Sequence, residues 1–267
     1  MGCFATCICG MKKKNGAPLG VHRSWRLCDY FLFVDADDYI DAEMYSTMAR
    51  YIGKDTDILE AGCRLVSVTG KILQRVSLQS ESIEGGRNCA VHYLKQKNVT
   101  NYMCNKLYRR ELLSTLTFAD LRYSEDFYVN VLSHFKARKK VIIPQEFYNY
   151  VIHSEQSTSA YNFSLARVDT IKAGIMIMKA FQSDDEMRSL AGGYVYSYYV
   201  TFANMLQQQG YKEWDKYRKQ TFRYIVYCFF NTNLKYISSE REKKFKEKAL
   251  RIFLLGKKYH FFEWMWE

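Results

Sequence analysis

The sequence predicts a mixed α/β sheet with helices on both faces, followed by an all-helical region. Residues 30–34 form an uninterrupted apolar run, which is typical of a fully buried strand. Helical and strand-like patterns then alternate as far as residue 160, and beyond it apolar residues recur at three- and four-residue steps. We therefore expect three parts: an atypical segment at 1–28, an α/β portion at 29–160 and a helical region at 161–267.

The first elements follow from their local patterns. Residues 1–28 show no clean period and are expected to be irregular. After the apolar strand, helical spacing predicts a helix over 42–52 with Asp41 as its N-cap. Two β-rich runs at 57–68 and 71–78, separated by Thr-Gly, predict a hairpin.

Helices and strands continue to alternate in the middle of the chain. Residues 83–96 and 105–114 are expected to form short helices, and 124–137 a longer one. Two further strands are predicted at 139–144 and 146–152. In the last part, helical spacing is carried by Val168, Ile171, Ile175 and Met178, and by Leu190, Tyr194, Tyr198 and Phe202.

Composition and charge narrow the function classes. The chain holds 39 basic and 28 acidic residues, a net charge of +11, and the last 57 residues supply +7 of it (14 minus 7). This excess favours an anionic partner, although a solvated lysine-rich helix face explains it equally; no nucleic-acid motif accompanies it. The 8 cysteines lack zinc-site spacing, so we expect reduced core thiols in a cytoplasmic protein, and no run is apolar enough to span a bilayer.

Clustered carboxylates follow the buried strand in the segment "FVDADDYI". A strand of an open α/β sheet places its carboxyl end at the edge where ligands bind. Asp35 and Asp37 are two residues apart, so along an extended strand both would face the same side. Two such carboxylates favour a shared Mg²⁺ or Mn²⁺, which also binds substrate phosphates. The alternative is helix capping, which Asp38 or Asp41 can provide alone.

Four segments together resemble the family 2 glycosyltransferases, nucleotide-sugar-dependent enzymes of GT-A fold. "DADD" is similar to the family's D-x-D segment, and "NKLYRRELL" (105–113) to a segment that follows its sheet. "YSEDFYVN" (123–130) resembles its acidic motif at a helix start, and "FYNYVIHSEQSTS" (147–159) the segment that closes its domain. The resemblance covers about half of the chain and implies a partial GT-A sheet.

The resemblance also implies roles for individual residues. Asp35 would lie near the nucleotide ribose and the metal, and Asp37 would ligate the metal on the diphosphate; Asp38 is a further candidate for donor binding. Asp126 would be the catalytic base that deprotonates an acceptor hydroxyl for an inverting displacement. His153 would complete the metal shell or offset leaving-group charge, unless it is an ordinary surface or packing residue.

Three basic residues of the second segment leave alternatives open. Lys106, Arg109 and Arg110 are either neighbours of an anionic substrate or part of an exposed helix face. The acceptor implied by the family is a glycan or a lipid-linked sugar, usually in bacterial surface polysaccharide synthesis. Peripheral contact with the inner face of the membrane through the basic C-terminus is a further expectation, with helix packing of that end as its alternative, and no nucleic acid is expected.

The sequence also departs from the family pattern. The family's opening strand and its nucleobase-binding aspartates have no counterpart before Asp35. The chain is therefore expected to be truncated, or to be completed by another polypeptide. A non-catalytic remnant that acts as a fold or interaction module is the rival interpretation, and a basic membrane- or nucleic-acid-binding protein is a weaker one.

Overall fold

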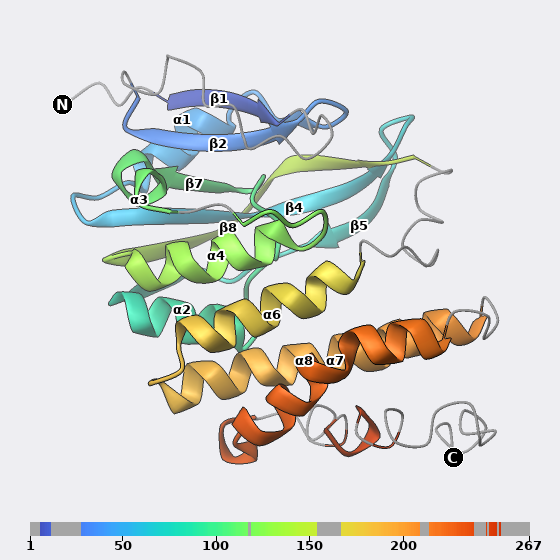
Figure 1. Cartoon of the computed structure of the whole chain (residues 1–267). Coiled ribbons are helices and arrows are strands. Elements are labelled where there is room, and N and C mark those ends of the chain that lie inside the picture. Colours follow the sequence, from blue (N-terminus) through green and yellow to red (C-terminus); the bar gives the residue numbers. More distant parts are fainter. Residues whose placement is uncertain are drawn as a thin grey trace. The chain divides into compact units, whose positions relative to one another are not determined.

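The computed structural model describes residues 6–11, 28–116, 119–153, 167–208 and 214–237, with 244, 246–249 and 251 (Figure 1). The chain separates into two compact units, each described below by itself. The first comprises Met1–Asp120 with Val129–Thr158, and the second comprises Leu121–Tyr128 with Ser159–Glu267.

One mixed sheet organises the first unit. Its order is β1-β2-β7-β4-β8-β3, with β5 added on β4 and β6 on β8. β2 is parallel to β1 and β4 is parallel to β8, whereas β7 runs antiparallel to both of its neighbours. The strands are β1 (Thr6–Met11), β2 (Tyr30–Asp35), β3 (Tyr39–Ile40), β4 (Thr56–Ser67), β5 (Ile72–Val76), β6 (Glu81–Glu84), β7 (Lys106–Arg109) and β8 (Lys139–Ile152).

Helices cover both faces of this sheet. Alternation along β2 places Phe31 and Phe33 in the core beneath α3 and α4, and Tyr30 and Leu32 in the core beneath α1 (Figure 1). Because both faces are covered, the strand is apolar throughout, as its sequence predicted. The helices are α1 (Met44–Arg50), α2 (Gly86–Leu94), α3 (Arg110–Ser114) and α4 (Glu125–Lys136).

The helix predicted over 105–114 is wrong in its first half. Residues Lys106–Arg109 form β7, a strand between β2 and β4, and only Arg110–Ser114 is helical. Leu107 and Tyr108 are buried in the cores on opposite faces of the sheet, which is the side-chain alternation of a strand. A four-residue strand is too short for its period to be read from the sequence alone.

The two strands predicted on either side of Pro144 are one strand, β8. Its register against β4 shifts between Ala61 and Gly62, whose partners are Ile143 and Glu146. Pro144 therefore lies within an irregularity of the ladder, where its missing N–H removes no regular hydrogen bond.

The N-terminal segment contributes a strand that its sequence did not predict. The backbone of Thr6–Met11 pairs in parallel with the whole of β2, from Tyr30 to Asp35. Backbone hydrogen bonds to β2 hold this strand in place, and they require no recognisable period of apolar side chains in the sequence.

The second unit is helical in its described part. Its helices are α6 (Val168–Ala180), α7 (Asp185–Gln208) and α8 (Trp214–Asn231), followed by the 3₁₀ turn η5 (Leu234–Tyr236). The predicted apolar stripe of α6 is confirmed, because Val168, Ile171, Ile175 and Met178 are all buried. Among the described helices, none has the length and apolar character needed to cross a membrane.

The cysteines largely agree with the expectation of core thiols. Cys63, Cys89, Cys104 and Cys228 are free and buried. Cys28 is disulfide-bonded, so the expectation of a reduced thiol is wrong for that residue.

Candidate active site

The predicted carboxylates lie in a turn at the carboxyl end of β2. The strand ends at Asp35, and Ala36 and Asp37 form a turn closed by the Asp38 N–H, which donates to the Asp35 carbonyl at 3.2 Å. The two metal-site candidates therefore do not share one extended strand, and that part of the prediction is wrong. The turn instead exposes Asp37, whose side chain is 52% accessible.

Tyr148 of β8 holds both ends of this turn. Its hydroxyl accepts a hydrogen bond from the Asp35 N–H at 3.1 Å and donates one to Asp38 Oδ2 at 2.6 Å. Asp38 Oδ1 accepts a second hydrogen bond, from the Val151 N–H at 2.8 Å. Burial raises the pKa of Asp38 above its usual value, and the two hydrogen bonds oppose that rise. Both carboxylate oxygens of Asp38 thus accept hydrogen bonds from within the chain. The contact of Asp38 with a donor stays a prediction.

A second clamp lies just beyond the turn. Asp41 was predicted to cap α1, but the residue that precedes the helix is Glu43, and it makes no side-chain cap. The Asp41 carboxylate instead accepts hydrogen bonds from Arg64 and, at 2.9 Å, from Asn149 Nδ2. These contacts fix the start of the helix to β4 and β8.

Asp37 and His153 meet at this edge of the sheet. His153 follows the last residue of β8, and its Nε2 lies 3.6 Å from Asp37 Oδ2. Nε2 is buried and has no hydrogen-bond partner among the described residues. An imidazole nitrogen without a hydrogen bond, beside a carboxylate oxygen, is a pair of ligands that a divalent cation can accept. When two ligand atoms each lie ~2.1 Å from one ion, they are typically ~3 Å from each other.

The protein supplies few ligands for such an ion. Within the described part of the chain, no group of three or more His, Cys, Asp or Glu side chains is arranged to hold a metal. Asp37 and His153 therefore fit a cation that takes its remaining ligands from water and substrate phosphates, as Mg²⁺ and Mn²⁺ do.

Two tyrosines flank the turn formed by residues 35–38, which we call the carboxylate turn. The rings of Tyr102 and Tyr150 stack with centroids 5.6 Å apart and planes inclined at 26°. Burial, with the charges of Asp38 and Asp35 adding to it, raises the pKa of Tyr150 to about 12, so its phenol is protonated at neutral pH. These rings and Tyr148 were not predicted from the sequence. Their one available signal was the alternation of Tyr148 and Tyr150 along a strand.

The buried charges beneath this edge correct the expectation for Lys106. Lys106 is not exposed on a helix: its Nζ is fully buried and lies 3.1 Å from Glu60 Oε1, while Lys140 Nζ lies 2.7 Å from Glu60 Oε2. Lys106 also donates to the Thr100 carbonyl at 3.0 Å and to the Tyr102 carbonyl. It therefore fixes the loop that carries Tyr102, and it is not a surface neighbour of an anionic substrate.

The predicted base, Asp126, lies in the first turn of α4 and is partly exposed. Its segment belongs to the second compact unit and is held there by several contacts. Phe127 stacks on Tyr194 with ring centroids 3.8 Å apart, and Ser124 Oγ lies 2.7 Å from Thr170 Oγ1. Asp126 and the carboxylate turn thus belong to different units, and the role of Asp126 as base stays a prediction.

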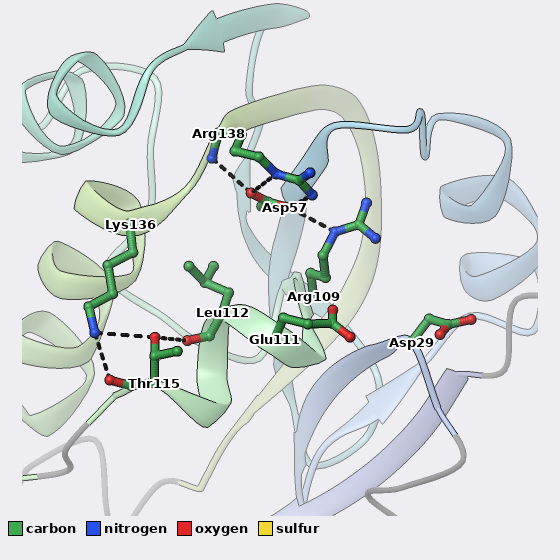
Figure 2. Close-up of a pocket in the computed structure, with 8 residues that line it drawn as sticks. All are labelled: Asp29, Asp57, Arg109, Glu111, Leu112, Thr115, Lys136 and Arg138. Carbon is green, nitrogen blue, oxygen red and sulfur yellow. Dashed lines mark hydrogen bonds and ion pairs between the residues drawn. The ribbon is translucent and has the colours of Figure 1, made fainter.

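A hollow of about 700 Å³ lies at the opposite edge of the sheet, where β2, β4 and β8 begin. Figure 2 shows Arg109 and Arg138 converging there on the buried Asp57. Arg109 Nε and Arg138 Nη2 each lie 2.7 Å from Asp57 Oδ1. Burial raises the pKa of Asp57, but these arginines outweigh it and lower that pKa.

Charge inside this hollow is balanced. Its lining has three cations and three carboxylates: Arg109, Lys136 and Arg138 with Asp29, Asp57 and Glu111. Arg109 therefore holds the sheet together at the edge away from the carboxylate turn, and Arg110 pairs with Glu111 at 3.0 Å. Neither arginine is a neighbour of the predicted donor site.

Comparison with known proteins bears on these features. No family model matches the chain. Over 148 residues the chain is 27% identical to the Bacillus subtilis (strain 168) protein named "Putative glycosyltransferase EpsH", covering 51% of this chain and 41% of that protein. The chain resembles a glycosyltransferase. It thus spans about two fifths of that relative's length.

The structural comparison supports the fold. The crystal structure of S. aureus TarS 1-349 matches 86% of this chain over 67% of its own length, with a TM-score of 0.54 and 16% identity. The predicted fold class, a GT-A-like α/β sheet flanked by helices and followed by a helical region, is confirmed by this match together with the described elements.

Proposed function

We propose that the chain is the sugar-transferring portion of a family 2-like glycosyltransferase. It would transfer a sugar from a nucleotide-diphosphate donor to an acceptor hydroxyl, with inversion at the anomeric carbon. Three features support the proposal: the sequence resemblance to a glycosyltransferase, the fold, and the Asp37–His153 pair at the ligand-binding edge of the sheet.

The donor site would be built on the carboxylate turn. Asp37 and His153 would hold Mn²⁺ or Mg²⁺, with Asp35 as a further ligand near the ribose and Asp38 at the back of the site. When bound, the cation would neutralise the donor's diphosphate and improve it as a leaving group. Tyr148 would keep the turn in one geometry, so that little conformational freedom is lost when the donor binds.

Asp126 would act as the base in a single displacement. Its carboxylate would take the proton from the acceptor hydroxyl as that oxygen forms a bond to the anomeric carbon. The bond from the anomeric carbon to the diphosphate oxygen would break, and its electron pair would leave with the nucleoside diphosphate. The position of Asp126 at the start of α4 favours the ionised carboxylate that this step needs.

The observation that carries the proposal is the approach of His153 Nε2 to Asp37 Oδ2 at 3.6 Å. It is tested by calorimetric titration of uridine and guanosine diphosphates into the chain, with and without Mn²⁺. We expect binding that needs Mn²⁺ and is lost in Asp37→Asn. Asp55→Asn is the matched control, because Asp55 is also well exposed, at 62% against 52% for Asp37, but lies at the other edge of the sheet.

A non-catalytic remnant is the second candidate. The match covers 41% of the curated relative, so most of that protein's length has no counterpart in the matched region. If the folded chain binds no nucleoside diphosphate under any metal condition, the remnant interpretation replaces the transferase. Transfer to a glycan or lipid-linked acceptor, a role in surface polysaccharide synthesis, a cytoplasmic location and membrane contact through residues 250–267 remain predictions. Of that last segment, all residues but Arg251 lie outside the described part of the chain.

A further inference from the structure

The solvent side of α8 carries a row of exposed apolar side chains. Phe222 is 43% exposed and Phe230 is 78% exposed; Val226, between them, is half-buried. Leu234, in the 3₁₀ turn that follows, is 37% exposed. The four residues recur every fourth position, so within the helix they lie along one side. Single exposed apolar residues are ordinary, but a row of this kind indicates a binding surface.

The row is separate from the packing face of the helix. Tyr217, Ile225 and Cys228 are at most 1% exposed and bury the opposite side of α8 within the helical unit. The helix is thus already anchored by its own core, and burial of Phe222 and Phe230 is not needed for that packing. We call the exposed side, formed by Phe222, Val226, Phe230 and Leu234, the α8 face.

The sequence of α8 has an excess of positive charge. It contains four cations and one carboxylate, a net charge of +3 (four minus one): Lys216, Arg218, Lys219 and Arg223 with Asp215. Arg223 is exposed beside Phe222. Lys235, next to Leu234, is 62% exposed, and its Nζ lies 3.9 Å from Asp185 Oδ2. The partner of this face should therefore combine negative charge with an apolar phase.

We propose that the α8 face docks on a bilayer surface that contains anionic lipids. Phenylalanine rings would enter the boundary between headgroups and acyl chains while the cations pair with lipid phosphates. A second copy of the chain fits less well, because two such faces would bring like charges together. The docking does not depend on the proposed transfer reaction, and it involves other residues than the predicted membrane segment 250–267.

Sedimentation of the full chain with vesicles tests the docking. Wild-type protein is expected to pellet with vesicles of phosphatidylcholine and phosphatidylglycerol, less at high salt, and little with phosphatidylcholine alone. In the double variant Phe222→Ser/Phe230→Ser, the partition coefficient should fall by about tenfold or more, because two apolar side chains are no longer transferred from water into the bilayer. Arg223→Glu should weaken binding to the anionic vesicles only.

Matched controls separate the α8 face from general effects. Leu73→Ser removes an apolar side chain that is 53% exposed on β5, in the first unit, and should leave vesicle binding unchanged. The double variant should stay folded and keep any binding of nucleoside diphosphate, because Tyr217, Ile225 and Cys228 still anchor the helix. A modest fall in melting temperature is expected, since Phe222 is 43% exposed and the Phe230 ring contacts Phe229.

Three results would overturn the proposal. Failure of the wild-type protein to pellet with anionic vesicles would contradict the proposal directly. A double variant that still pellets like the wild type would place the membrane contact elsewhere, for example in residues 250–267. A lipid-free dimer, detected by light scattering and abolished by the double variant, would assign the face to a second copy of the chain.

Discussion

The hydroxyl of Tyr148 joins the carboxylate of Asp38 at 2.6 Å, and the same oxygen accepts the Asp35 N–H at 3.1 Å. One fully buried side chain from β8 thereby fixes the turn that follows β2. The strands come from residues more than a hundred positions apart in the chain. The geometry of the candidate donor site depends on this pairing, and not only on the D-x-D residues themselves.

Replacing Tyr148 with phenylalanine should loosen the turn. Asp38 would lose one of its two hydrogen bonds while staying partly buried, so we expect a loss of about 1–2 kcal/mol in the free energy of unfolding. The bond to Asp38 favours the ionised carboxylate, so its share of the deficit should be present at neutral pH and shrink as pH falls below the raised pKa of Asp38. The share that comes from the Asp35 N–H, which loses its acceptor, should remain at every pH. Urea titrations at several pH values measure both effects.

Tyr45→Phe is the control for this substitution. The Tyr45 hydroxyl is buried and has no hydrogen-bond partner among the described residues. Burial raises its pKa to about 12, so it is neutral throughout the tested range. Its removal should leave stability unchanged or raise it slightly. A loss as large as that of Tyr148→Phe would mean that the clamp has no special energetic role.

Glu60 should dominate the acid sensitivity of the first unit. Burial raises its pKa, but the charges of Lys106 and Lys140 outweigh burial and lower the pKa from 4.5 to about 2. Because the folded pKa lies below the unfolded one, the stabilisation is present above pH 4.5 and is lost as pH falls toward 2. A shift of this size corresponds to about 3 kcal/mol.

Glu60→Gln makes this prediction measurable. At neutral pH the variant leaves Lys106 and Lys140 buried without a carboxylate, and it should lose about 3 kcal/mol or more. The gap to the wild type should narrow as the pH falls from 4.5 toward 2. The triple variant Glu60→Leu/Lys106→Met/Lys140→Met should be much less destabilised, because it removes every charge together. Equal destabilisation of both variants at neutral pH would contradict a charge-based account.

The sequence predicted the fold class because its strongest signals are local. The apolar run of β2 and the helical spacing of α6 need no information from distant residues, and both were placed correctly. β7 was missed because four residues give too little period, and its strand geometry comes from pairing with β2 and β4. Similarly, β8 continues past Pro144 because a register shift against β4 accommodates it.

In the candidate site, too, only the residues with a local sequence pattern could be predicted. Asp35 and Asp37 could be found from sequence because three carboxylates after an apolar strand are a local pattern. Tyr148 could not be assigned, since its contact with Asp38 depends on how β3 and the preceding turn fold back on β8. Lys106 was misjudged because its buried partner, Glu60, lies on another strand.

His153 offers a prediction specific to the metal site. His153→Phe keeps a ring of similar shape but removes the Nε2 that faces Asp37, so Mn²⁺ binding in the presence of a nucleoside diphosphate should weaken by about tenfold or more. Relaxation of water protons by bound Mn²⁺ reports this affinity directly. His92→Phe is the control, because His92 pairs with Glu81 away from the carboxylate turn. Unchanged Mn²⁺ affinity in His153→Phe would reduce His153 to a simple ion-pair partner of Asp37.

Gly86 sets how closely the start of α2 approaches the end of α4. A Cβ at this position would lie 1.9 Å from the carbonyl oxygen of Phe135, and backbone atoms cannot give way as a flexible side chain can. Gly86→Ala should therefore lower the free energy of unfolding by about 1–3 kcal/mol. Gly53→Ala is the matched control: its Cβ would meet no atom nearer than Thr56 Oγ1 at 3.5 Å, an ordinary contact. Chemical denaturation of the two variants compares them, and equal stabilities would show that α2 can move away from α4 at little cost.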